Sequence, residues 1–243
     1  MFHSLRRLFS ASGNSFGARG QPVTNRDISR WAAQQRLAIV THATDGHFDL
    51  GGDIHGHPWR LECSTPTRDY VQGLELRGRA DVGADPDAAV MVINRPLQEL
   101  LEKRTYDEIT DTLQTAISSS LPEEMRWLSM YENVEWPGLP ASFRDHFTVV
   151  AERIEVAQRW VHAPVVSQLL NAVEGEGGAE RAQSPMVLML ARGRVYLRLE
   201  HTQRSLAEIA HAKQLLLVAG QAALQNLPPM SVGGPDDEAG AIR

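Results

Sequence analysis

A strict alternation of apolar and charged residues in the N-terminal third is the feature that most constrains this chain. Trp59, Leu61 and Cys63 alternate with Arg60 and Glu62. Successive side chains of a β-strand point to opposite faces of a sheet, so the alternation predicts strands with one buried and one solvent-facing side. Similar segments recur at short intervals, and we expect five strands there, at 37–43, 47–54, 58–63, 71–79 and 89–94.

Short polar segments separate the first four of these strands. They contain Asp45-Gly46 and Gly56-His57-Pro58, residue types that favour tight turns. We therefore expect an antiparallel meander with one wet face that carries a ladder of opposite charges. The segment from Val90 to Ile93 is apolar on both sides, which predicts a central strand covered on both faces.

Helices are predicted on either side of this meander. Thr24 and Asp27 form a capping box for a helix over 25–36. Residues 95–135 are expected to be helical. We expect three helices there, whose starts are marked by Pro96, by Thr105 with Glu108, and by Ser120 with Glu123.

The next part of the chain alternates between strand, helix and loop. A strand is predicted at 147–151 and a helix at 155–173. Pro164 should fall near a kink or a boundary of that helix, because proline lacks a backbone N–H. The segment 174–184 is rich in Gly and Glu and is expected to be a flexible surface loop.

A hairpin and a long helix are predicted to follow. Residues 186–190 and 195–200 flank the turn residues Arg192-Gly193. The last helix extends to residue 226, and Leu215 to Ala219 are apolar on every face, so this helix should be buried. The predicted fold class is therefore α+β. A mainly antiparallel sheet, formed by the N-terminal meander and a C-terminal hairpin, packs against several helices, with a long buried C-terminal helix.

Composition divides the chain into three regions. Residues 1–23 are expected to form a flexible basic N-terminal segment. Residues 24–227 are interpreted as a single α+β domain, with two packed lobes, 24–136 and 146–227, as the alternative. Residues 228–243 are rich in Pro, Gly and Asp and are expected to be a disordered tail.

Charge is distributed unevenly along the 243 residues. The first 26 residues contain four arginines and no acid, so the rest carries 20 of the 24 basic side chains and all 30 acidic ones. An acidic body repels phosphate backbones, which argues against nucleic-acid binding. The single cysteine excludes an intrachain disulfide and fits a reducing compartment, so we expect a soluble, cytoplasmic protein.

One polar cluster has residue types that bind metal ions. Asp53, His55 and His57 stand two residues apart, and imidazoles at this spacing on one strand share a face and can chelate zinc. The alternative is a solvated turn, because His57 precedes Pro58. We interpret the cluster as a turn and expect no metal and no cofactor. Further possible ligands come earlier in the chain: His42, Asp45, His47 and Asp49.

The chain offers no clear nucleophile. Cys63 alternates with Trp59 and Leu61 on the predicted inner face, which is typical of a buried hydrophobic side chain. The sequence contains no Gly-x-Ser-x-Gly elbow, no Walker loop and no Gly-x-Gly-x-x-Gly segment after a strand. We therefore assign no catalytic residue.

Two Arg-Gly-Arg triplets could bind an anion. Arg77-Gly78-Arg79 and Arg192-Gly193-Arg194 each place two guanidinium groups close together, where they could grip a phosphate or a carboxylate. The alternative for the first triplet is cross-strand pairing with Glu62 and Glu75. The alternative for the second is an exposed hairpin tip.

Two features suggest a protein partner. Trp136 precedes Pro137-Gly138 in a loop and is the first candidate among the five tryptophans for an exposed aromatic anchor, with packing in the core as the alternative. The helical region also presents an acidic face that could meet a basic partner, although such faces are usually just solvated. Its acidic residues are 99, 102, 107, 108, 111, 123, 124, 132 and 135.

These observations predict a non-catalytic intracellular binding module of unknown ligand. One alternative is a metal-dependent hydrolase that uses Asp53, His55 and His57. The other is a peripheral membrane adaptor that makes a weak lipid contact through residues 1–9. In that segment apolar and basic residues lie at helical spacing: Phe2, Leu5, Arg6, Arg7, Leu8 and Phe9.

Overall fold

The structure is a computed structural model that describes residues 23–44, 46–112, 121–174, 178–201 and 205–228. The predicted N-terminal segment and tail lie almost entirely outside these residues, and so does the suggested membrane contact of residues 1–9. Within the described ranges, no helix is long and apolar enough to cross a lipid bilayer.

Nine strands of the described chain form one sheet in which every neighbouring pair is antiparallel. Across the sheet the order is β1-β2-β3-β4-β9-β8-β5-β7-β6. The N-terminal meander thus joins the C-terminal hairpin through the β4–β9 pair. The strands are β1 (Ala38–Thr41), β2 (Phe48–Ile54), β3 (His57–Ser64), β4 (Leu74–Asp81), β5 (Val90–Asn94), β6 (Glu132–Asn133), β7 (Phe147–Ala151), β8 (Met186–Ala191) and β9 (Arg194–His201).

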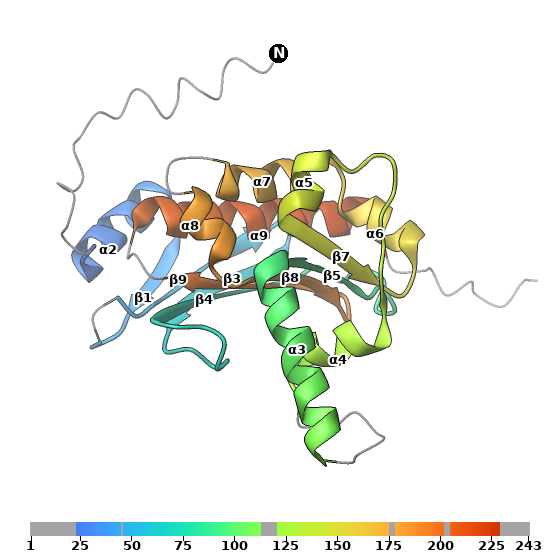
Figure 1. Ribbon diagram of the computed structural model, residues 1–243. Coiled ribbons are helices and arrows are strands. Elements are labelled where there is room, and N and C mark those ends of the chain that lie inside the picture. Colours follow the sequence, from blue (N-terminus) through green and yellow to red (C-terminus); the bar gives the residue numbers. More distant parts are fainter. Residues whose placement is uncertain (1–22, 45, 113–120, 175–177, 202–204, 229–243) are drawn as a thin grey trace, which may run out of the picture.

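Helices cover the two faces of this sheet unequally (Figure 1). Helices α3 (Arg95–Thr112) and α4 (Glu123–Met130) lie below the sheet as drawn. The remaining helices lie on the opposite face, which we call the inner face. They are α2 (Asn25–Gln34), α5 (Ala141–His146), α6 (Ile154–Trp160), α7 (Ala163–Val173), α8 (Gly178–Gln183) and α9 (Leu206–Asn226).

Helix α9 crosses the inner face over β2, β4 and β9. Two glycines allow this close approach. A Cβ atom added at Gly78 would lie 3.0 Å from Leu216 Cδ2, and one added at Gly220 would lie 3.0 Å from Ile54 Cδ1. Leu215 and Leu216 are fully buried. The predicted α+β class with a buried C-terminal helix is confirmed.

Side-chain alternation along the strands separates two hydrophobic cores. Inner-face residues of the sheet pack against α2 and α5 to α9, whereas outer-face residues of β5, β7 and β8 pack against α3 and α4. On β5, Val92 faces the first core and Met91 the second, and both are completely buried. The prediction that Val90 to Ile93 form a strand covered on both faces is therefore confirmed.

The predicted helix cap, hairpin turn and helix boundary are confirmed at three positions. Thr24 Oγ1 accepts from the backbone N–H of Asp27, and the Asp27 carboxylate accepts from the backbone N–H of Thr24, which completes the capping box. Arg192 and Gly193 both have positive φ in the turn of the β8–β9 hairpin. Pro164 lies in the first turn of α7, so it marks a boundary between two helices.

The predicted helix boundaries between 95 and 135 are wrong in two places. Helix α3 continues past Thr105, because the Thr105 hydroxyl donates to the carbonyl of Leu101 one turn earlier instead of capping a new helix. Helix α4 follows Pro122, which makes no side-chain cap, and Ser120 lies outside the described residues.

Part of the predicted loop 174–184 is also helical. Helix α8 occupies its second half and packs beside α7. Arg181 Nε donates to the carbonyl of Ala172 at 2.6 Å, which ties the two helices together. This tertiary contact stabilises a segment whose Gly-rich composition favours a loop.

Candidate functional site

Five arginines line a cleft on the outer face of the sheet. The cleft has a volume of about 620 Å³ and lies over β3, β4 and β9, beside the start of α4. Helices α3 and α4 cover the outer face farther along, at β5, β7 and β8. The arginines of the cleft are Arg60, Arg68, Arg77, Arg79 and Arg198.

The strand register places four of these arginines in directly opposed pairs. Arg60 on β3 faces Arg79 on β4, and Arg77 on β4 faces Arg198 on β9. Like charges directly opposite each other across an antiparallel pair destabilise a sheet. The arrangement therefore needs anions nearby to offset the repulsion.

Glu75 is the first of two buried carboxylates that meet this need. Its side chain is fully buried, although it belongs to the outer face of β4. It accepts from the backbone N–H and the hydroxyl of Thr67, at 2.8 and 3.2 Å. Arg77 and Arg198 both donate to it from their Nη1 atoms. One buried carboxylate thus accepts from both arginines of an opposed pair.

Glu124 at the start of α4 is the second buried carboxylate. Arg68 donates to it through Nε at 2.9 Å and Nη2 at 3.3 Å, and the Tyr70 hydroxyl donates at 2.6 Å. Arg198 Nε lies 3.5 Å from the same carboxylate. Burial raises the pKa of Glu124, but the hydrogen bonds from Arg68 and Tyr70 outweigh it and the net pKa lies below its ordinary value.

Tyr70 stays protonated in this environment. Burial, followed by the nearby Glu124 charge, raises the pKa of its hydroxyl well above the ordinary value. The hydroxyl is therefore a permanent donor to Glu124. Together with Arg68 it ties the segment between β3 and β4 to α4, which forms one wall of the cleft.

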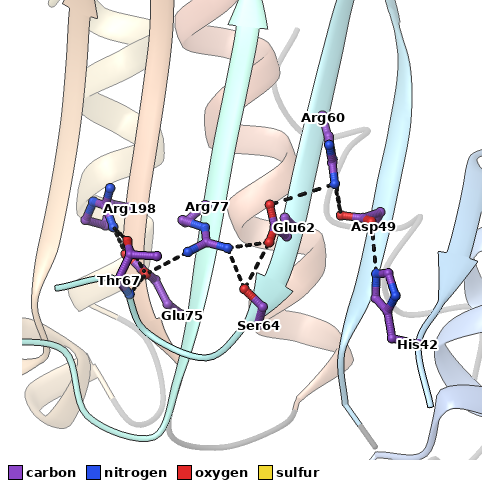
Figure 2. Close-up of polar contacts among 9 residues, drawn as sticks. All are labelled: His42, Asp49, Arg60, Glu62, Ser64, Thr67, Glu75, Arg77 and Arg198. Carbon is purple, nitrogen blue, oxygen red and sulfur yellow. Dashed lines mark hydrogen bonds and ion pairs between the residues drawn. The ribbon is translucent and has the colours of Figure 1, made fainter. Parts of the chain in front are cut away.

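The ion pairs continue across the sheet as a chain that we call the polar ladder (Figure 2). Arg77 Nη2 donates to Glu62 and, at 2.6 Å, to the Ser64 hydroxyl. On the next strand, Arg60 binds Asp49 through Nε at 3.1 Å and Nη2 at 2.7 Å. In order across the sheet, the polar ladder consists of His42, Asp49, Arg60, Glu62, Arg77, Glu75 and Arg198.

Two exposed arginines of the cleft, Arg60 and Arg79, keep guanidinium donors without an acceptor among the described residues. A guanidinium group has five N–H donors, and Asp81 occupies only the Nε and Nη2 atoms of Arg79. The side chains of Arg60 and Arg79 are 62% and 49% exposed. Among the described residues, their Nη1 atoms have no acceptor. These two opposed arginines can therefore bind an external anion.

An apolar strip adjoins the arginines. Val187 and Met189 line the same cleft, and Tyr196 lies next to Arg79 across the β4–β9 pair. A tyrosine has an apolar ring and a polar hydroxyl, so Tyr196 suits the boundary between the apolar residues and the charged ones. The cleft can thus contact both an anionic group and a short apolar one.

The structure separates the histidines and acids that the sequence suggested as metal ligands. His55 and Gly56, both with positive φ, form the two-residue turn between β2 and β3, so His55 and His57 do not lie on one strand. Asp53 accepts from the backbone N–H of Gly56 at 2.7 Å, and His57 Nδ1 lies 3.1 Å from the carbonyl of Asp81. The expected solvated turn describes this segment.

The upstream members of that cluster lie at the other end of β2. His42 Nε2 contacts Asp49 at 2.9 Å and belongs to the polar ladder. Asp49 and Asp53 are four residues apart, about 13 Å along a strand. His47 pairs through its backbone with His42, and Asp45 lies outside the described residues. In the described part of the chain, no three His, Cys, Asp or Glu side chains are grouped closely enough to hold a metal ion.

The remaining candidates have different positions. Cys63 is fully buried on the inner face of β3. Arg192 is at the hairpin tip, where it pairs with Glu123, and Arg194 pairs with Asp81.

Two residues of the predicted partner surfaces, Trp136 and Glu124, are less exposed than expected. Trp136 is half-buried against the main core. Glu124 is 2% exposed and faces Arg68, so it is no part of a solvated acidic face. Glu99, Glu102, Glu132 and Glu135 are exposed, but they belong to α3, to β6 and to the loop after it.

Sequence reasoning found only part of the cleft. The predicted cross-strand pairing of Arg77 with Glu62 is present. Arg77 also pairs with Glu75, but Glu75 lies on the same strand and is fully buried, so the predicted solvated cross-strand pair is wrong there. The sequence does not single out Arg68 or Arg198, and it places Glu124 only on the acidic helical face. Their signals are separate charges between β3 and β4, on the polar side of β9 and in the first turn of α4, and these do not reveal that the residues meet.

Comparisons with known proteins add little to this geometry. No protein-family model matches the sequence, and no curated protein matches it. Among solved structures, the chain is similar to the crystal structure of the mycobacterial trehalose monomycolate transport factor A, TtfA. The TM-score is 0.44 at 10% sequence identity, over 84% of this chain and 96% of that one.

Proposed function

We propose that this protein is a non-catalytic binding module that holds an acidic segment of a partner protein in the arginine-lined cleft. The observation that carries the proposal is the pair Arg60 and Arg79. They face each other across β3 and β4, are about half exposed or more, and keep Nη1 donors free of acceptors in the described chain. A carboxylate placed between them would accept from both and relieve their repulsion.

The ion pairs of the cleft support this proposal because they fix the arginines before a ligand arrives. Asp49 holds Arg60 and Asp81 holds Arg79, each through two guanidinium nitrogens. The buried Glu75 fixes the neighbouring pair. Preorganised donors lose less side-chain entropy on binding than free ones, which improves affinity.

The arginines of the lining favour anion binding. In the described residues, the cleft is lined by Arg, Glu, Asp, aromatic and apolar side chains and by no Ser, Cys, Lys or His. Guanidinium groups bind carboxylates well, but they do not act as general bases because their pKa is too high.

A peptide suits the cleft better than a nucleic acid does. The apolar strip of Val187 and Met189 beside the arginines would receive one apolar side chain of an acidic segment. The acids Glu62, Asp81 and Glu123 also line the cleft and would repel a continuous phosphate backbone. We further propose a cytoplasmic location, which the single buried cysteine supports.

A charge-reversal experiment tests the proposed function. The probe is a fluorescein-labelled peptide of alternating Glu and Leu, and the readout is fluorescence anisotropy with the full chain. We expect Arg60→Glu with Arg79→Glu to weaken binding at least about tenfold, because two charge-assisted contacts are lost. Added salt should weaken binding to the wild-type protein.

The matched control is Arg30→Glu with Arg159→Glu, two exposed arginines on α2 and α6 outside the cleft. This variant makes the same change in net charge and should bind the probe as the wild type does. Equal losses in both variants would mean that only net charge matters. No binding by the wild type at any salt concentration would refute the proposal.

A further inference from the structure

A second cavity lies on the inner face of the sheet, on the side of β4 and β9 opposite the cleft. It has a volume of about 250 Å³. Its walls come from β4, β9, the first two turns of α9, the end of α7 and α8. On the two strands, Leu76 and Leu199 line this cavity, whereas their neighbours Arg77 and Arg198 line the cleft. The two sites are therefore separate.

Most of the cavity wall is apolar. The side chains involved are aliphatic or aromatic, and they belong to both strands and helices. Asn94 also lines it, but its amide is fully engaged with the carbonyls of Ala182 and Ser184 and with the N–H of Met186. The apolar lining comprises Leu76, Phe147, Val173, Met186 and Leu199.

Two histidines and a glutamate form a polar end. His201 closes β9 and is 2% exposed, and its Nδ1 lies 2.5 Å from Glu208 on α9, a contact without hydrogen-bond geometry. His211, one turn farther along α9, lines the cavity as well. Its Nε2 atom is buried and has no hydrogen-bond partner among the described residues. A buried polar atom without a partner is uncommon, and this one belongs to a side chain that lines the cavity.

The charged side chains around the cavity have partners within the protein, which favours an uncharged ligand. The Glu208 carboxylate contacts His201, and Glu200 accepts from the backbone N–H of Gln72. Arg181 donates to the carbonyl of Ala172. Burial, followed by the charge of Arg181, lowers the pKa of His211, so its imidazole is neutral at pH 7. A neutral imidazole offers one donor and one acceptor, and a hydroxyl group can satisfy either.

Volume limits the size of such a ligand. A water molecule takes about 30 Å³ in the liquid, so the cavity has room for roughly eight waters. A molecule with about eight non-hydrogen atoms fits the same space. We propose that this cavity is a binding site for a small, uncharged, mainly apolar molecule whose hydroxyl group hydrogen-bonds to His211 Nε2.

The test compares three ring compounds that differ in one group: benzyl alcohol, toluene and benzoate. Each is titrated into the ¹⁵N-labelled full chain while the imidazole nitrogen signals of His201 and His211 are followed by NMR. We expect a saturable shift at His211 with benzyl alcohol. Its affinity should exceed that of toluene by about fivefold, the effect of one net hydrogen bond, and benzoate should bind most weakly.

Two variants and a control locate the binding. Val173→Trp should fill the cavity and abolish the shift, whereas Gln214→Trp adds the same ring on the exposed side of α9 and should leave it unchanged. His211→Leu removes the hydrogen bond, so benzyl alcohol should lose its advantage over toluene, monitored through backbone amide signals. This comparison decides the question even if Val173→Trp fails to fold.

Three results would overturn the proposal. They are the absence of a saturable shift at His211, equal or tighter binding of toluene or benzoate by the wild type, and an unchanged preference for the alcohol in His211→Leu.

Discussion

Arg77 and Arg198 are direct cross-strand partners on β4 and β9, and both donate to the buried carboxylate of Glu75. Two like charges thus share one anion that no solvent reaches. A buried charge that loses its partner is strongly destabilising, so the three residues depend on one another.

Glu75→Gln should therefore lower the free energy of unfolding by about 1–3 kcal/mol, because the two arginines lose their shared counter-ion and keep only Glu62 and Glu124 as acidic partners. Urea denaturation at pH 7 measures the change. Glu99→Gln on the exposed side of α3 is the control and should change stability by less than about 0.5 kcal/mol. Equal effects of the two substitutions would contradict the role given to Glu75.

Glu124 should make stability depend on pH. Its folded-state pKa lies below the ordinary value, so its contribution is fully present above the unfolded pKa, near 4.3, and is lost as the pH falls through the folded-state pKa. We expect the gap in unfolding free energy between wild type and Glu124→Gln to narrow from pH 7 to pH 3. Urea melts at several pH values test this, and a gap independent of pH would show that the pKa is not depressed.

Leu216 should be essential to the packing of α9 on the sheet. It is fully buried and lies against Gly78 on β4. Leu216→Ala should cost about 2–5 kcal/mol in denaturant melts, the range for a buried leucine. Leu217→Ala, one position along and half-buried, should cost clearly less. A loss below about 0.5 kcal/mol for Leu216→Ala would place α9 on the surface.

Purified protein should contain no stoichiometric zinc. His55 lies in a turn, Asp53 is engaged by Gly56, and His57 contacts a backbone carbonyl. Elemental analysis of untagged protein prepared without chelator checks this expectation. About one equivalent of zinc that disappears in the His55→Ala, His57→Ala double variant would restore the hydrolase hypothesis.

The elements that the sequence predicted well are those whose signals are local. Alternation along Trp59 to Cys63 identifies a strand and its buried face without knowledge of the partner strand. The capping box at Thr24 and the apolar stretch of α9 are local as well. Each signal lies within one helical turn, one helix or one strand, where the spacing of apolar and polar residues indicates the secondary structure.

The candidate site depends on contacts between distant segments, and these could not be predicted. Arg198 meets Glu75 across 123 positions of sequence, and Arg68 meets Glu124 across 56. Nothing local indicates that β4 pairs with β9. The same reason explains why Glu124 was assigned to a solvated face, since charged residues on helices are exposed unless a distant partner buries them.

The pairing of β4 with β9 also has a consequence for synthesis on the ribosome. Strand β4 ends at Asp81 and its partner begins only at Arg194. At ribosomal rates of about 5–20 residues per second, the edge of β4 stays without its partner strand β9 for roughly 6 to 23 seconds. An open strand edge invites pairing with other chains, and charged side chains oppose it. Glu75, Arg77 and Arg79 would thus protect the nascent meander from aggregation before they line the cleft.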